Sequence, residues 1–334
     1  MPLLYEIIVL ELRHRARQNV APAGHNFAAF VSYNYTHTGE KYMSKTKQKL
    51  QDFVDLVVIP AMENNKAKWD CIFKRGCFPK NAITQKEYKG INWLMLNYEH
   101  NQKEYSKPFF ATYKQWKKVE AQVYKGSKGT MVVFYKPLFK TSKIDPSKEV
   151  QAGCVLTYST VFNIDQVDLS NSSFKEIETE FKTGKQYSID AIDKFVKSTQ
   201  VEINHQNGRG CFYAPSKDLI NMELKTNFKN TNESDATVHY YSTLFHELTH
   251  STMHEKRLNR KNKFDDSKKS YAYEELIAEL GSVLFSNHFN ITKQMPANHA
   301  KYLNSWIKCL KNDFSFLTGA IAQAQKAFDL FTVK

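Results

Sequence analysis

Two histidines four positions apart, His246 and His250, with Glu247 between them, have the clearest chemical potential in this chain. The preceding residues 238–245 contain neither Gly nor Pro, so the segment is predicted to be an α-helix. Positions i and i+4 share a helical face, so both imidazoles can bind one Zn²⁺ ion while Glu247 acts as general base toward a water molecule. The alternative is a helix whose two histidines are ordinary surface or core residues.

A second predicted helix, residues 271–281, supplies candidates for a third ligand, because a catalytic zinc usually has three protein ligands and an open position. Its segment Glu275-Leu-Ile-Ala-Glu279 is similar to the Glu-x-x-(Ser/Ala)-(Asp/Glu) motif of gluzincin metallopeptidases. That resemblance implies that Glu275 binds the metal and that Glu279 orients a ligand imidazole. Glu274 is the fallback ligand, although a solvated carboxylate on the helix surface is the favoured interpretation for it.

Charge is unevenly distributed along the 334 residues. Residues 1–150 hold 25 basic and 13 acidic side chains, a net charge of +12, whereas residues 151–334 hold 22 and 21, a net charge of +1. This asymmetry indicates that the first half binds a polyanion while the second half does something else. The alternative is a lysine-rich solvated surface.

Within the basic half, cations alternate with aromatic residues between Lys66 and Lys140. Cations that follow phosphates beside rings that stack on bases are the two components of single-strand binding, although rings at such spacing are more often buried in a core. We predict a helix over 115–123, a tight turn over 125–129 and a short strand over 132–135. Residues 79–92 read as a loop entering a helix, where polar side chains either cap the helix or contact a ligand. The candidate nucleic-acid contacts are Lys80, Asn81, Tyr88, Lys89, Asn92, Trp116, Lys125 and Lys128.

Composition narrows the class of protein. The mean hydropathy of −0.54 and the lack of an apolar run near 18 residues favour a soluble protein with no membrane partner. Five cysteines, an odd and sparse set, favour a reducing compartment, and residues 1–12 lack the features of a signal peptide, so we expect a cytoplasmic protein. Residues 1–42 show neither helical nor strand periodicity over most of their length and are treated as an extension of uncertain structure; Met43 is the hypothesised natural start, which intact mass would test.

From about Lys45 to the C-terminus the chain resembles the ArdC antirestriction family of plasmids and mobile elements. The similar stretches keep the same order and similar gaps; they are residues 79–84, 88–92, 113–116, 123–134, 161–166, 212–220, 240–250, 257–260 and 271–281. Two stretches depart from the family: the entry rich in Trp and Pro is reduced to residues 66–69, and Ser251-Thr-Met-His254 replaces the usual Trp-Thr-Gly-His. The resemblance implies a single-stranded-DNA-binding domain followed by a zincin-like metallopeptidase domain.

We therefore predict an α+β protein with a basic sheet-and-helix domain at 43–145, a polar linker over 140–149 and a zincin-like domain at 146–334. The expected function is to bind incoming single-stranded DNA and protect it from restriction, with one Zn²⁺ ion or another divalent metal supporting peptide hydrolysis. A tyrosine among Tyr213, Tyr271 and Tyr273 is expected to stabilise the oxyanion.

Two rival interpretations stay open. One is a pure DNA-binding protein with a proteolytically silent zinc site. The other is a metalloprotease recruited to DNA, whose substrate is a restriction protein or another DNA-bound protein. A secreted thermolysin-like protease is disfavoured by the basic first half and the missing signal peptide.

Overall fold

The computed structural model describes residues 44–63, 78–141, 149–174, 189–230, 235–261, 264–291, 300–311 and 313–333. The extension at 1–42 and the entry at 66–69 lie outside these ranges. The described chain begins with α2 (Lys45–Phe53), which continues through a π-helical turn, η1 (Val54–Val58), into α3 (Ile59–Glu63). Ser44 caps this helix by accepting a hydrogen bond from the Lys47 amide, which fixes where the helix begins.

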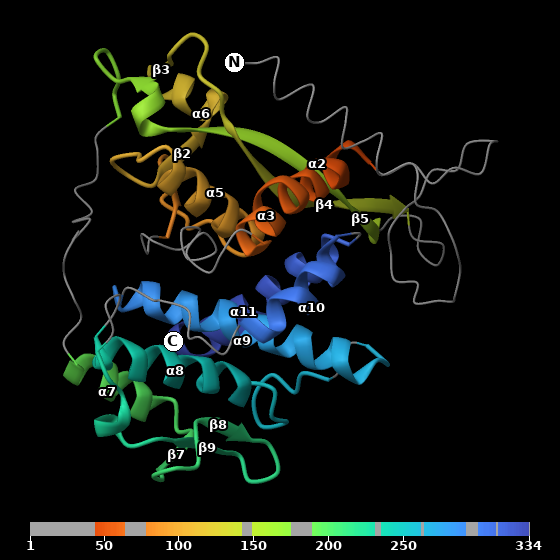
Figure 1. The fold of residues 1–334 in the computed structure, drawn as a ribbon. Helices are drawn as coiled ribbons and strands as arrows, with labels where there is room; N and C mark the ends of the chain where they lie inside the picture. The colour runs from red at the N-terminus through yellow and green to blue at the C-terminus, as the bar shows by residue number, and fades with distance from the viewer. Residues whose placement is uncertain are drawn as a thin grey trace. The chain divides into compact units, whose positions relative to one another are not determined.

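A four-stranded sheet with the order β1-β2-β5-β4 forms the centre of the first half (Figure 1). Its strands are β1 (Lys80–Asn81), β2 (Phe109–Thr112), β4 (Thr130–Thr141) and β5 (Glu149–Asn163). Helix α5 (Ile91–Gln102) packs against β4, and α6 (Tyr113–Lys118) follows β2. A second, two-stranded sheet pairs β3 (Gln122–Val123) with β6 (Val167–Asp168), which follows the 3-10 turn η2 (Ile164–Gln166).

Two predictions for this half need correction. The helix predicted over 115–123 ends at Lys118, because Glu120 adopts a left-handed φ of 58° that stops the helix before β3. The strand predicted over 132–135 is 12 residues long, because β5 pairs with it along its whole length. Since β5 runs to Asn163, the predicted boundary at residues 145 and 146 falls between two paired strands of one sheet.

In the described residues of the second half, a three-stranded sheet is accompanied by five α-helices. Strands β7 (Glu202–His205) and β9 (Leu219–Met222) are parallel, and β8 (Phe212–Ala214) is antiparallel to β9 in the order β7-β9-β8. In Figure 1, helix α8 lies between this small sheet and α9. The helices and the 3-10 turn of this half are α7 (Ile189–Ser198), η3 (Lys225–Asn227), α8 (Ala236–Ser251), α9 (Ser267–His288), α10 (Ala300–Leu310) and α11 (Ser315–Thr332).

The largest apolar core draws on both halves of the chain. Val58 and Trp93 from the first half belong to the same buried cluster as Phe245, Phe285 and Leu317 from the second. The mixture of helices and sheets confirms the α+β prediction. Among the described helices, none combines the length and apolar character needed to cross a bilayer.

Candidate metal centre

Two packed helices, α8 and α9, position the candidate site. The Asp235 side chain caps α8 by accepting a hydrogen bond from the Val238 amide at 2.8 Å, which fixes where the helix begins. Gly281 on α9 lies directly against Thr249 on α8, since a Cβ at position 281 would lie within 3.0 Å of three Thr249 side-chain atoms. This close approach brings the acidic face of α9 to the histidine face of α8.

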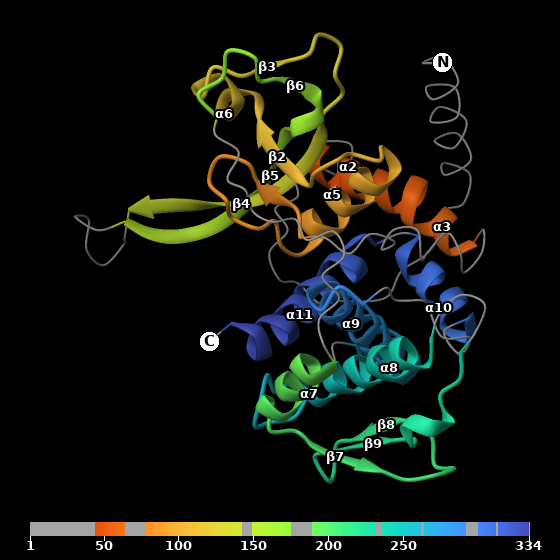
Figure 2. The ribbon, with the colours of Figure 1, turned by 90° about the vertical axis from the view of Figure 1, so that its left-hand side faces the viewer.

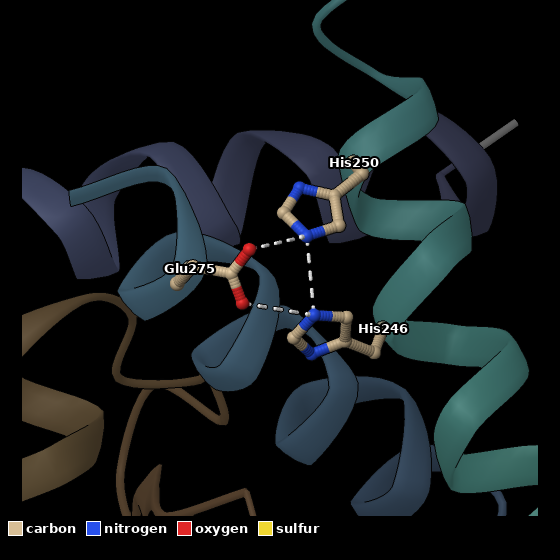
Figure 3. A group of neighbouring side chains, drawn as sticks. All are labelled: His246, His250 and Glu275. Carbon is tan, nitrogen blue, oxygen red and sulfur yellow. Dashed lines mark hydrogen bonds and ion pairs between the residues drawn. The ribbon is translucent and has the colours of Figure 1, made fainter. Parts of the chain in front are cut away.

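The three side chains predicted to bind metal converge in the structure (Figure 3). The Nε2 atoms of His246 and His250 are 3.1 Å apart, and they lie 3.6 and 3.7 Å from the two carboxylate oxygens of Glu275. Tetrahedral ligands at about 2.0–2.1 Å from a zinc ion lie about 3.3 Å from each other. The donor atoms therefore have the chemistry and the spacing to hold one divalent cation.

Each imidazole has a second carboxylate at its Nδ1 atom, on the other side of the ring. Glu279 Oε2 is 3.6 Å from His246 Nδ1, and Glu274 Oε1 is 3.2 Å from His250 Nδ1. Such partners fix the tautomer and the orientation of a metal-binding imidazole. Glu279 therefore lies beside the candidate ligand His246, the position that the gluzincin resemblance implies for it.

Glu274 is not the solvated carboxylate favoured by the sequence analysis. Its oxygen accepts hydrogen bonds from both His250 and Arg260, whose guanidinium is nine-tenths buried at 7% exposure. Arg260 also donates to the Thr249 carbonyl at 3.2 Å and to the Thr252 hydroxyl, at the end of α8. Sequence reasoning missed this role because nothing in the local pattern links residue 260 to residue 274.

The site carries an excess of negative charge that a cation would balance. Burial opposes protonation of His246, yet the carboxylates of Glu275, Glu279 and Glu247 raise the pKa of this histidine to about 10. Burial likewise opposes ionisation of Glu274, but hydrogen bonds and charge from His250 and Arg260 hold the pKa of its carboxyl below the usual value. Buried carboxylates that stay ionised around two imidazoles are suited to a divalent metal.

The three tyrosines considered as oxyanion donors have different environments in the structure. The exposed Tyr271 hydroxyl hydrogen-bonds the Glu275 carboxylate, which places it beside the cluster. Tyr273 is buried against Phe264 and Phe316 in the core. The Tyr213 hydroxyl donates to Asp218 at 2.9 Å, and burial is the main cause that raises the pKa of this tyrosine to about 12.

Some of the predicted nucleic-acid contacts are on the surface. Lys125 and Lys128 are exposed around the turn that precedes β4. Lys80 and Lys89 already have acidic neighbours: Lys80 Nζ lies 3.8 Å from Glu87, and Lys89 Nζ lies 2.8 Å from Asp329 of α11.

Others are structural, which corrects their assignment as DNA contacts. Trp116 is fully buried, and its indole donates to the Phe162 carbonyl at 3.1 Å, so its ring cannot stack on a base. The Asn81 side chain accepts hydrogen bonds from the amides of residues 83 and 84 and contacts the Tyr88 hydroxyl. Asn92 pairs with both backbone groups of Val133. Their polar groups are already used to hold the loop and the sheet together.

Comparison with known proteins extends this picture. Residues 47–189 match the family described as the N-terminal domain of anti-restriction factor ArdC, and residues 190–324 match a family of zincin-like metallopeptidases. The crystal structure of antirestriction ArdC protein from R388 plasmid, solved metal-free and with Mn(II), is similar over nearly its whole length. The TM-score is 0.68 and the identity 30% in both forms, covering 84% and 86% of this chain and 96% and 97% of that protein. This chain belongs to the ArdC antirestriction family.

Two of the other relatives of this ArdC family member are much longer than this chain. Two Escherichia coli proteins named DNA primase TraC are 30% and 29% identical over 319 and 306 residues, 90% and 86% of this chain. The chain spans only 21% and 27% of their length. An uncharacterized Sinorhizobium fredii (strain NBRC 101917 / NGR234) protein, y4eC, is 28% identical over 75% of this chain and 80% of its own length. The Mn(II) in the R388 protein and the zincin-like domain together point to a divalent metal.

Proposed function

We propose that this ArdC family protein binds single-stranded DNA, protects incoming mobile-element DNA from restriction, and hydrolyses peptide bonds with its zincin-like domain. The observation that carries the proposal is the convergence of His246 and His250 of α8 with Glu275 of α9, next to Glu247 of α8. The net charge of +12 in the first half and the exposed Lys125 and Lys128 support the DNA-binding part.

His246, His250 and Glu275 would hold the metal, with zinc the proposed ion because imidazole and carboxylate donors in this number suit it. When bound, the ion supplies Lewis acidity and lowers the pKa of water. Glu247, which is buried beside the cluster, accepts a proton from the attacking water at its carboxylate and returns it to the leaving amine. The Tyr271 hydroxyl, which hydrogen-bonds the Glu275 carboxylate, is the proposed donor to the developing oxyanion.

The test compares wild type, Glu247→Gln and Glu255→Gln in a restriction-protection assay on transferred DNA, with metal content measured for each preparation. Glu255 is an exposed residue just after α8 and serves as the matched control. We expect Glu247→Gln to keep its metal and lose peptide hydrolysis by about 10²- to 10⁴-fold, the usual contribution of a general base, together with protection. Full protection by Glu247→Gln would instead show that DNA binding suffices and that the metal site is proteolytically silent.

A DNA-recruited protease that acts on DNA-bound proteins is the second candidate. Lys89 of the basic half pairs with Asp329 of α11, a helix that packs on α9, so the two activities share a structural connection. Cleavage of a DNA-bound protein that rises on adding single-stranded DNA would favour this candidate over a DNA-independent peptidase.

A further inference from the structure

The hairpin of β4 and β5 is packed on both faces at its inner end. Val132 on one face belongs to a buried cluster with Leu96 and Phe110, and Val133 on the other face belongs to a cluster with Leu50 and Met95. Both valines are buried, at 6% and 7% exposure. Helices and neighbouring strands therefore cover this part of the hairpin completely.

Beyond Val133, large apolar side chains of β4 become exposed, while Leu156 of β5 still packs against the cluster of Leu50 and Met95. We call residues 134–139 of β4 and their partners 151–157 of β5 the distal ribbon. Figure 2 shows this part of the hairpin extending past α2 and α5. The exposed fractions are 46% for Phe134, 69% for Tyr135, 45% for Leu138, 57% for Phe139 and 37% for Val155. Such a concentration of exposed apolar groups on one element marks an interaction surface.

Two of these rings share one face of the distal ribbon. Side chains alternate along a strand, so Tyr135 and Phe139 point to the same side. The register shift between Leu138 and Phe139 leaves the extra residue on β5, so the alternation along β4 is unbroken. Tyr158 lies opposite Val133 and therefore extends this face inward, where Lys49 Nζ is 5.2 Å from its ring centroid. Three rings thus follow one another along the ribbon.

The stretch of chain that contains these rings is strongly basic. Residues 113–139 contain six lysines and one acidic residue, Glu120, a net charge of +5. Tyr113 and Tyr124 are also exposed in this stretch, at 45% and 54%. All six of these lysines are exposed: Lys114, Lys117, Lys118, Lys125, Lys128 and Lys136. Exposed flat rings along a strand that continues from a turn with exposed cations complement a polyanion whose bases are unstacked, which is single-stranded nucleic acid and not a duplex.

We propose that the distal ribbon is the base-stacking surface for single-stranded DNA, with Tyr135 and Phe139 stacking on bases while the lysines neutralise phosphates. This inference rests on the proposed DNA-binding function and assigns it a surface. It also replaces Trp116, which the core encloses, with rings that a base can reach.

The test measures binding of the full-length protein to two labelled oligonucleotides of equal length, oligo-dT and an abasic strand with the same phosphates. The variant Tyr135→Ala/Phe139→Ala should bind oligo-dT about tenfold or more weakly, because it loses two stacking platforms. Its affinity for the abasic strand and its salt slope should stay near those of wild type, because no phosphate contact is lost. Lys125→Ala/Lys128→Ala should weaken binding to both strands.

Phe212→Ala, which removes a similarly exposed ring from β8 of the second half, is the matched control and should bind like wild type. The variant Tyr135→Trp/Phe139→Trp should bind oligo-dT as wild type does, because tryptophan keeps a ring on which a base can stack. Unchanged oligo-dT affinity in the double alanine variant, an equal loss on the abasic strand, or conversion of an oligomer to a monomer would overturn the proposal. Failure of wild type to bind either strand would refute the proposed DNA-binding function itself.

Discussion

At the scale of single residues, Arg260 is a part of the candidate site that the sequence did not predict. It is nine-tenths buried, and it connects the carbonyl at the end of α8 to Glu274 on α9. Since Glu274 in turn contacts His250 Nδ1, Arg260 acts on the candidate metal ligand through Glu274. Removal of the guanidinium would leave a buried carboxylate with one partner fewer.

We predict that Arg260→Met weakens metal binding by about 10- to 100-fold, the usual cost of losing a partner behind a metal ligand. Competition with a chromophoric chelator and the absorption spectrum of the Co²⁺-loaded protein would measure it. Arg260→Lys should restore part of the affinity, because it keeps the charge but not the planar fork. Arg257→Met is the control, since Arg257 lies on the same loop but pairs with Asp218. Equal metal affinity in the Arg260→Met protein and wild type would contradict this role.

Asp218 gives a pH-dependent prediction away from the metal ligands. The Asp218 backbone has a left-handed φ of 51°, and the Asp218 carboxylate accepts hydrogen bonds from Arg257 and Tyr213. Burial disfavours the ionised form, but these two partners lower the pKa of Asp218 overall. Because the pKa of Asp218 is lower in the folded state, its ionised carboxylate stabilises the folded protein at pH values above the unfolded pKa of about 3.9. This stabilisation is lost as the pH falls through the folded-state pKa.

Asp218→Asn tolerates the left-handed backbone but removes the charge. We expect it to lower the free energy of unfolding at pH 7 by about 1–3 kcal/mol, with the difference from wild type narrowing below about pH 4. Urea unfolding at several pH values would measure this. A difference that stays constant from pH 7 to pH 3 would show that the charge is not responsible.

At the scale of elements, the approach of α9 to α8 depends on Gly281. A Cβ there would lie 2.4 Å from Thr249 Oγ1 and 2.5 Å from Thr249 Cγ2, closer than packed atoms allow. Thr249 lies one residue before His250, so any separation of the helices at this point moves the histidine face away from Glu275.

Gly281→Ala is therefore expected to destabilise the protein by about 1–3 kcal/mol from overpacking, despite the better helix propensity of alanine, and to weaken metal binding. Thermal unfolding and metal titration would measure both effects. Thr249→Ala in the same chain should recover part of the loss, giving a coupling energy in a double-mutant cycle. Additive effects of the two substitutions would argue against contact between them.

Elements with strong local patterns were predictable. The lack of Gly and Pro before His246 predicts α8, the apolar stripe around Glu275 predicts α9, and the i, i+4 rule places both histidines on one face. The extent of β4 was not predictable, because its length depends on a partner strand beginning at Glu149. Trp116 was predicted to contact DNA because it lies in a stretch where lysines alternate with aromatic residues, whereas its burial depends on tertiary contacts with Phe162 and Phe174. Arg260 and Glu274 meet across a loop that no periodicity describes.

At the scale of the whole molecule, the charge asymmetry predicts that DNA binding and peptide hydrolysis depend differently on salt concentration. Because phosphate neutralisation releases counterions, affinity of the full chain for single-stranded DNA should fall steeply between about 50 and 200 mM salt. Peptide hydrolysis of a small neutral substrate should change little over the same range, since residues 151–334 carry a net charge of +1. At each salt concentration, fluorescence anisotropy would measure the DNA affinity and a fluorogenic peptide would measure the rate of hydrolysis. A salt-independent DNA affinity would contradict the electrostatic part of the proposal.

The largest core contains Val58 near the start of the described chain and Phe328 near its end, and the Gln51 amide donates to the Leu310 carbonyl at 3.1 Å. Contacts of such sequence separation form only when both partners exist. During synthesis, the helix over residues 45–63 therefore cannot bury its apolar face until α10 and α11 have left the ribosome, and chaperones can bind that face in the meantime. A stalled or prematurely terminated product would leave the face exposed and would be recognised as misfolded, even though it contains the whole four-stranded sheet.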